Sequence, residues 1–163
     1  LHGNRLSGSV PSALASLALL GVLYLDENEL TGSLPTELGK LRYLEEMYLS
    51  SNKLTGVIPT NFGSLKNLKL LRINDNEIGG YIPSELGFLS NLETIDLESN
   101  AFFGKIPIEL SHLFSLEHAR FHGNHLSGIV PVWLCPEFIH GLVELTADCR
   151  AGIICDCCTS CYD

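Results

Sequence analysis

Apolar residues recur along this chain in a fixed order whose step changes within each unit. In one unit, Leu38, Leu41 and Leu44 follow one another at intervals of three residues. The interval then falls to two at Met47 and Leu49. A step of three matches a 3₁₀-like segment, and a step of two matches a β-strand. Each unit is therefore predicted to contain one short strand and one loose helical return.

Asparagine, glycine and proline share one longer period along the sequence. Asparagine recurs at Asn4, Asn28, Asn52, Asn76, Asn100 and Asn124. Glycine recurs at Gly8, Gly32, Gly56, Gly80, Gly104 and Gly128, and proline at Pro11, Pro35, Pro59, Pro83, Pro107 and Pro131. Three residue types in phase define a repeat. Because a single turn cannot bury its own apolar face, the turns must stack around one continuous core.

The repeated asparagine is predicted to be structural. It follows each strand and points inward, where an amide without hydrogen-bond partners costs about 1–3 kcal/mol. Its oxygen and its two N–H groups can bond the backbone of its own turn and of the next. We therefore expect the six asparagines to form a ladder that holds the turns together.

The unit LxxLxxLxLxxNxLxGxIPxxLxx resembles the plant-type leucine-rich repeat of receptor-like kinase ectodomains and polygalacturonase-inhibiting proteins. The resemblance implies an α/β fold at an extracellular or cell-surface location. This fold is a right-handed solenoid with a parallel β-sheet on the concave face and 3₁₀ or loop returns on the convex face. It also implies ligand recognition on the concave sheet.

The chain divides into two parts. Residues 1–134 are assigned to about six turns, the first of them truncated, and residues 135–163 to a degenerate last strand and a cysteine-rich C-terminal cap. Solenoids need capping units at their ends, and the helical N-terminal cap of similar proteins is missing here. We expect the chain to be part of a longer one, and an uncapped end is the alternative.

The last turn is predicted by continuing the period. One further step along the sequence leads to Val143 and Leu145 as core positions and to Asp148 in place of the ladder asparagine. One last strand is therefore expected over residues 142–147. Trp133 and Phe138 are expected to cover the exposed end of the core.

Six cysteines lie in the cap, at Cys135, Cys149, Cys155, Cys157, Cys158 and Cys161. An even number in an extracellular protein favours disulfides, although the spacing does not fix the pairing. The alternative is a thiolate metal site, but only Cys158 and Cys161 have the usual CxxC spacing. We predict disulfides and no metal. The ending LTADC…CDCCTSC also resembles the caps of some algal leucine-rich repeat proteins.

The predicted concave face presents three columns of side chains, because equivalent residues of successive turns become lateral neighbours about 4.8 Å apart in a parallel sheet. The first column is Val22, Glu46, Leu70, Thr94 and His118. The second is Tyr24, Tyr48, Arg72, Asp96 and Arg120. The third is His2, Asp26, Ser50, Asn74, Glu98 and His122.

Tyrosine and arginine are frequent hot spots of interaction surfaces, so these columns predict a ligand-binding site. Its candidate residues are Tyr24, Glu46, Tyr48, Arg72, Asn74, Asp96, Glu98, Arg120 and His122. The alternative is a self-satisfied surface on which Asp96 neutralises both Arg72 and Arg120.

Composition and charge exclude several functions. The chain has 163 residues, of which 30 are leucine, and a net charge of −9 with ten Lys and Arg, which argues against nucleic-acid binding. No run of about 18 apolar residues predicts a membrane span in this chain, although a longer protein could carry one. The possible threonine array of an ice-binding face is interrupted at Gly79 and Phe103.

The chain is not predicted to be an enzyme and needs no cofactor. Glu98 and His122 form a possible acid–base pair, but no nucleophile on a strained turn and no glycine-rich phosphate loop accompany it. We predict an extracellular module that docks a protein, peptide or glycan. The alternatives are a secreted inhibitor of a cell-wall-degrading hydrolase and a cell-surface or matrix adhesion module.

Overall fold

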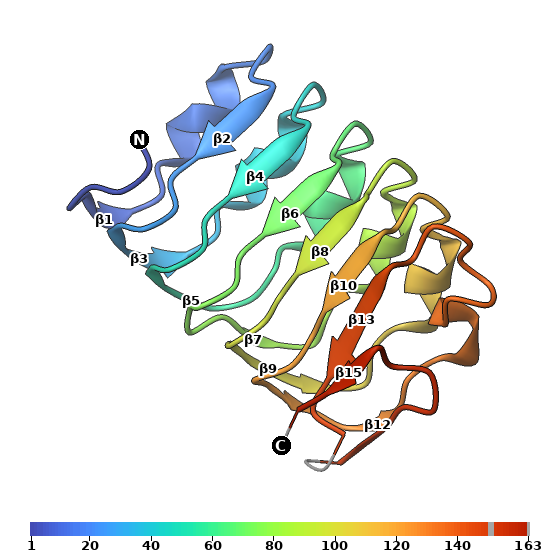
Figure 1. Ribbon diagram of the computed structural model, residues 1–163. Coiled ribbons are helices and arrows are strands. Elements are labelled where there is room, and N and C mark those ends of the chain that lie inside the picture. Colours follow the sequence, from blue (N-terminus) through green and yellow to red (C-terminus); the bar gives the residue numbers. More distant parts are fainter. Residues whose placement is uncertain (150–151, 163) are drawn as a thin grey trace.

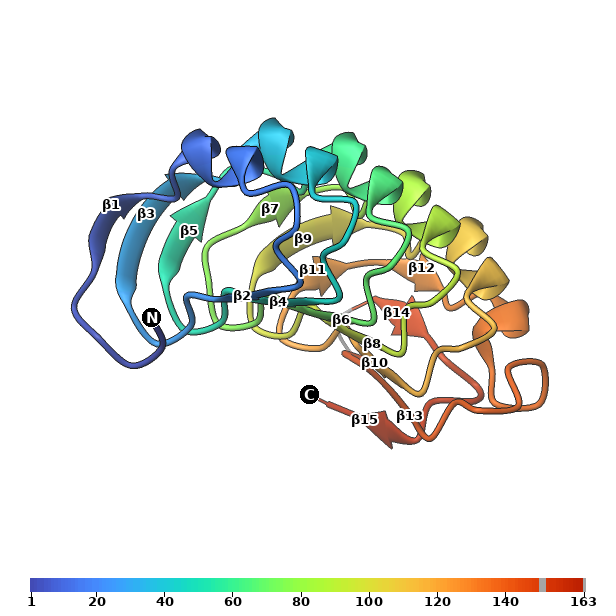
Figure 2. The ribbon, with the colours of Figure 1, turned by 90° about the horizontal axis from the view of Figure 1, so that it is seen from above.

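The computed structural model describes residues 1–149 and 152–162 as a curved coil of stacked turns (Figure 1). One parallel sheet of seven strands runs through all the turns. Its strands are β2 (Val22–Tyr24), β4 (Glu46–Tyr48), β6 (Leu70–Arg72), β8 (Thr94–Asp96), β10 (His118–Arg120), β13 (Glu144–Ala147) and β15 (Ser160–Cys161). In Figure 2 this sheet lies on the inner, concave side of the arc, as predicted.

The helical returns lie on the outer side of the arc (Figure 2), and within residues 1–149 and 152–162 every helix is a 3₁₀ helix. They are η1 (Ser12–Ser16), η2 (Thr36–Lys40), η3 (Thr60–Ser64), η4 (Ser84–Phe88), η5 (Ile108–His112) and η6 (Val132–Leu134). Each begins directly after a repeat proline. The proline ring fixes φ, and the missing N–H costs nothing there, because the N–H groups at the start of a helix have no partner within the helix. The proline period thus sets where each return begins.

Short parallel strands complete each turn between the concave sheet and the helices. They form one sheet of β1 (Ser7–Ser9), β3 (Glu29–Ser33) and β5 (Lys53–Thr55), and another of β7 (Gly79–Gly80), β9 (Ala101–Gly104) and β11 (His125–Leu126). A last pair joins β12 (Gly128–Ile129) to β14 (Ile153–Ile154). The repeat leucines fill one continuous core between these layers.

The inward-pointing asparagines bond to backbone groups of neighbouring turns. The Asn100 Oδ1 accepts the Ile78 N–H at 3.0 Å, and its Nδ2 donates to the carbonyls of Ile73, Leu97 and Glu98 at 3.0–3.3 Å. The same pattern recurs at Asn28, Asn52, Asn76 and Asn124. Asn4 is exposed and donates only to two nearby carbonyls of its own turn.

The register of the last strand differs from the prediction. β10 pairs with β13 so that Ala119 lies opposite Leu145, whereas the repeat period would have placed Val143 there. Val143 is consequently 68% exposed, and its predicted core position is wrong. The longer turn over residues 135–141 shifts the strand by two residues. Because side chains alternate between the two faces of a strand, a shift of two keeps Leu145 on the buried face.

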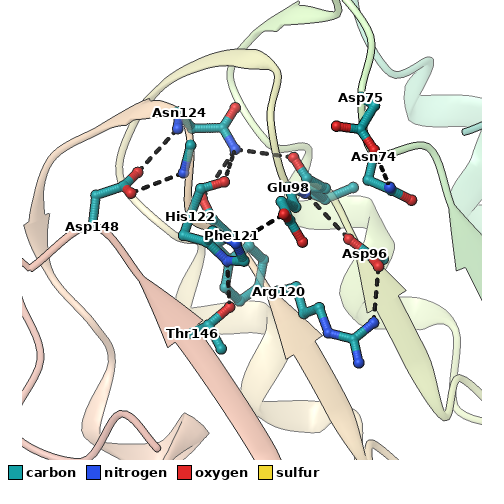
Figure 3. A network of polar contacts seen from close by, with 12 residues as sticks. Asn74, Asp75, Asp96, Glu98, Arg120, Phe121, His122, Asn124, Thr146 and Asp148 are labelled. Carbon is teal, nitrogen blue, oxygen red and sulfur yellow. Dashed lines mark hydrogen bonds and ion pairs between the residues drawn. The ribbon is translucent and has the colours of Figure 1, made fainter. Parts of the chain in front are cut away.

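Asp148 does not replace the ladder asparagine. Its carboxylate accepts the backbone N–H groups of Gly123 and Asn124 at 2.8 and 3.0 Å (Figure 3). In the preceding turn the corresponding N–H groups, those of Ser99 and Asn100, donate to backbone carbonyls of the next turn. Asp148 therefore ends the ladder by supplying the acceptors that a further turn would have supplied.

The cap is closed by three disulfides, which join Cys135 to Cys157, Cys149 to Cys161 and Cys155 to Cys158. This pairing of all six sulfurs supports the disulfide prediction over a thiolate metal site. Cys155, Cys157 and Cys158 pack against the core. In the described part of the chain, no helix is long and apolar enough to cross a membrane.

Candidate functional site

The first part of the concave sheet carries a cluster of two tyrosines and an arginine. The rings of Tyr24 and Tyr48 meet edge to face, with centroids 4.6 Å apart and planes at 76°. The Arg72 Cζ lies 5.4 Å from the centroid of the Tyr48 ring, within the range of a cation–π contact. Tyr24 and Tyr48 also line a cavity of about 290 Å³ together with His2 and Asp26.

Glu46 holds the outer tyrosine of this cluster in place. The Tyr24 hydroxyl donates to the Glu46 Oε2 at 2.5 Å. Because the hydroxyl proton is held by a carboxylate, the hydrogen bond to Glu46 raises the pKa of Tyr24 to about 12. Tyr24 is nonetheless 44% exposed. Its ring face is therefore positioned but remains open to a ligand.

Arg72 has no anionic partner among the described residues. Its Nε is buried and lacks a hydrogen-bond partner, whereas Asp96, its lateral neighbour in the sheet, bonds to Arg120 instead. A buried donor left unpaired costs about 1–3 kcal/mol. The self-satisfied surface expected as the alternative thus applies to Arg120 and does not apply to Arg72.

The later part of the sheet is occupied by an ion-pair network, of which Figure 3 shows the bond between Arg120 and Asp96. The Arg120 Nη1 lies 3.0 Å from the Asp96 Oδ2, and its Nη2 lies 2.6 Å from the Glu144 Oε2. The His118 Nδ1 lies 3.2 Å from the same Glu144 oxygen. The hydrogen bond from Arg120 lowers the pKa of Glu144, and the same bond raises the pKa of Arg120. Extending the second column from Arg120 by one further repeat would have led to Glu144.

His122 is closed off from the concave solvent. Its Nδ1 lies 2.8 Å from the Thr146 Oγ1, and its Nε2 lies 3.0 Å from the Glu98 Oε1 (Figure 3). The Tyr162 ring stacks on the His122 ring with the centroids 3.8 Å apart, and the His122 side chain is 12% exposed. Tyr162 lies beyond the repeat, so the period gave no signal for it.

The predicted site residues therefore fall into two groups. Tyr24, Glu46, Tyr48 and Arg72 form one cluster at β2, β4 and β6, which we call the tyrosine–arginine cluster. Asp96, Glu98, Arg120 and His122 bond to one another or to residues of the last turn. Asn74 lies between the two groups, where it accepts from Ser50 and donates to Asp75.

The ion-pair network predicts a pH-dependent contribution to stability. Replacing Glu144 with Gln is expected to lower the free energy of unfolding at pH 7 by about 1 kcal/mol. Because Arg120 depresses the folded-state pKa of Glu144, this contribution is complete above the unfolded pKa and is lost as the pH falls through the folded pKa. Urea unfolding at several pH values from 7 down to about 2 measures it. A difference between the wild type and Glu144→Gln that does not shrink as the pH falls would contradict the prediction.

Stacked parallel turns around one core, with a parallel sheet on the concave side, define a repeat solenoid. A leucine-rich repeat family model matches residues 42–102, and a second matches residues 20–41. A comparison with curated protein sequences gives no match.

Three solved structures show the relationship. The ectodomain of the receptor kinase GASSHO1/SCHENGEN3 from Arabidopsis thaliana, in complex with CASPARIAN STRIP INTEGRITY FACTOR 2, is 38% identical with a TM-score of 0.86, over 88% of this chain and 17% of that chain. The Arabidopsis receptor kinase HAESA, in complex with the peptide hormone IDA and the co-receptor SERK1, is 34% identical with a TM-score of 0.82, over 99% and 26%. A chain of the Arabidopsis BIR3–SERK2 complex is 38% identical with a TM-score of 0.72, over 78% and 68%.

The chain belongs to the leucine-rich repeat family, and the predicted fold class is confirmed. It spans 17% and 26% of the length of the GASSHO1/SCHENGEN3 and HAESA chains.

Proposed function

We propose that this chain is an extracellular recognition module that binds a protein or peptide on the tyrosine–arginine cluster. The ligand places an acceptor oxygen, from a carboxylate or a carbonyl, against Arg72 and an apolar or ring group against Tyr24 and Tyr48. The observation that carries the proposal is that the Arg72 guanidinium lies against the Tyr48 ring and has no anionic partner among the described residues, because Asp96 bonds to Arg120. An acceptor from the ligand would pair with this guanidinium.

Two further observations support this proposal. The three disulfides of the cap fit an oxidising, extracellular location. The related receptor kinases were solved in complex with CASPARIAN STRIP INTEGRITY FACTOR 2 in one case, and with the peptide hormone IDA and the co-receptor SERK1 in the other. An open sheet of this shape offers an extended surface for such ligands. A hydrolase inhibitor or an adhesion module would use the same surface, and no separate feature of the concave face favours either.

The test is a binding screen against arrays of secreted proteins, peptides and glycans, followed by affinity measurements with the double variant Tyr48→Ala/Arg72→Ala. We expect a protein or peptide ligand whose affinity falls about tenfold or more in the double variant, because both hot-spot side chains are removed. Arg42→Ala is the matched control, since Arg42 is exposed in the loop after η2, away from the concave sheet. Unchanged affinity in the double variant would place the binding site elsewhere.

A further inference from the structure

The convex face carries an aromatic groove between the last two helical returns. The groove lies between η5 and η6 and has a volume of about 570 Å³. The side chains that the argument uses are Ile108, Glu109, His112, Phe114, Trp133 and Phe138. Trp133 and Phe138 are 52% and 43% exposed, so each side chain keeps part of its surface open to the groove.

The groove lies beside a position at which the glycine of the preceding three returns is replaced. Gly39, Gly63 and Gly87 occupy one position on η2, η3 and η4, where each lies against the backbone of the next turn. A Cβ built on Gly63 would lie 2.5 Å from the Glu85 carbonyl oxygen. The corresponding residue of η5 is Ser111, which carries a Cβ. The close approach that these glycines allow is therefore not repeated in the same form at η5, where the groove to η6 lies.

Aromatic rings and one carboxylate meet in this space. The rings of Trp133 and Phe138 meet edge to face, with their centroids 4.6 Å apart. Phe114 lines the same groove and is 73% exposed. Glu109 makes no hydrogen bond or ion pair with its side chain among the described residues. Aromatic faces attract cations, and a carboxylate beside them adds a point of charge. The groove therefore has the chemistry to hold a cation on an apolar stem.

We propose that this groove binds an arginine side chain presented by a protein or peptide partner. The guanidinium is planar, stacks on aromatic faces and pairs with a carboxylate, whereas a lysine ammonium is a compact and strongly hydrated charge. The arginine stacks on Trp133 or Phe138 and bonds to Glu109, while its methylene groups cover Ile108. This site lies on the convex face and does not depend on the function proposed for the concave sheet.

The chain reports on this groove directly because Trp133 is its only tryptophan. The probe is the peptide acetyl-Gly-Arg-Gly-amide, and its citrulline counterpart is a neutral probe of the same shape. Titrations are followed by tryptophan fluorescence at pH 8. We expect saturable binding of the arginine peptide, with a Kd about five- to tenfold lower than that of the citrulline peptide.

Two glutamine variants separate the groove from the general acidity of the surface. Glu109→Gln is expected to weaken arginine binding about fivefold and to reduce the preference over citrulline to about twofold or less. Glu85→Gln changes the same position on η4, where no tryptophan follows, and is expected to leave binding unchanged. Thermal unfolding verifies that both variants are folded. Absence of saturable binding, equal affinity for both peptides, or equal losses in both variants would each overturn the proposal.

Discussion

Replacing Asn100 with Ala is expected to lower the free energy of unfolding by about 3 kcal/mol. The variant leaves the buried Ile78 N–H without an acceptor and removes the amide donor that three carbonyls share. Each buried group left unpaired costs about 1–3 kcal/mol, and the missing side chain also leaves a cavity. Urea unfolding followed by circular dichroism measures the change.

The outer end of the ladder supplies the matched control. Asn4 is exposed, and its side chain bonds only to the carbonyls of Leu1 and His2, so Asn4→Ala is expected to cost less than about 0.5 kcal/mol. Asn100→Asp is the second variant, because it keeps the acceptor but places a carboxylate against three carbonyl oxygens. It should destabilise at least as strongly as Asn100→Ala at pH 7. If Asn4→Ala and Asn100→Ala cost the same, the ladder does not hold the turns together.

The parts of the fold that could be predicted from sequence are those that repeat. Equivalent positions of successive turns, such as Met47 and Leu71, face the same core environment, so one unit specifies the burial and strand pairing of all the others. The prediction fails where the period fails. Two additional residues before Leu145 change the register in which the last strand pairs with β10. The earlier turns all have the same length, so they do not indicate whether extra residues shift the strand or form a bulge outside it.

The candidate site was predictable in composition and not in connectivity. Residues at one column position are lateral neighbours, so Asp96 lies beside both Arg72 and Arg120. Its choice of Arg120 depends on the geometry of long side chains and on Glu144, which joins the same guanidinium. Backbone periodicity specifies neither factor. The open tyrosine–arginine cluster therefore became visible only once the partners of Arg120 were known.

The tight glycine column predicts the second large effect. Gly87→Ala is expected to lower the free energy of unfolding by about 2–3 kcal/mol, the upper range for overpacked sites. A Cβ at this position would collide with the Glu109 carbonyl oxygen, a backbone atom that cannot rotate away. Gly21→Ala is the control, because a Cβ there would lie 3.9 Å from its nearest neighbour, the Tyr43 carbonyl oxygen. This substitution should cost less than about 1 kcal/mol.

Substitutions at this helix position also test the origin of the convex groove. If a Cβ at this position forces the next turn away, Gly87→Ser should separate η4 from η5 as Ser111 separates η5 from η6. A crystal structure of Gly87→Ser is expected to show a second opening, lined by Glu85 and Glu109. Conversely, Ser111→Gly should let η6 approach η5, narrow the groove and bury Trp133 more deeply, with a blue shift of its fluorescence. An unchanged tryptophan spectrum in Ser111→Gly would mean that the lengthened last turn, and not the serine, holds the groove open.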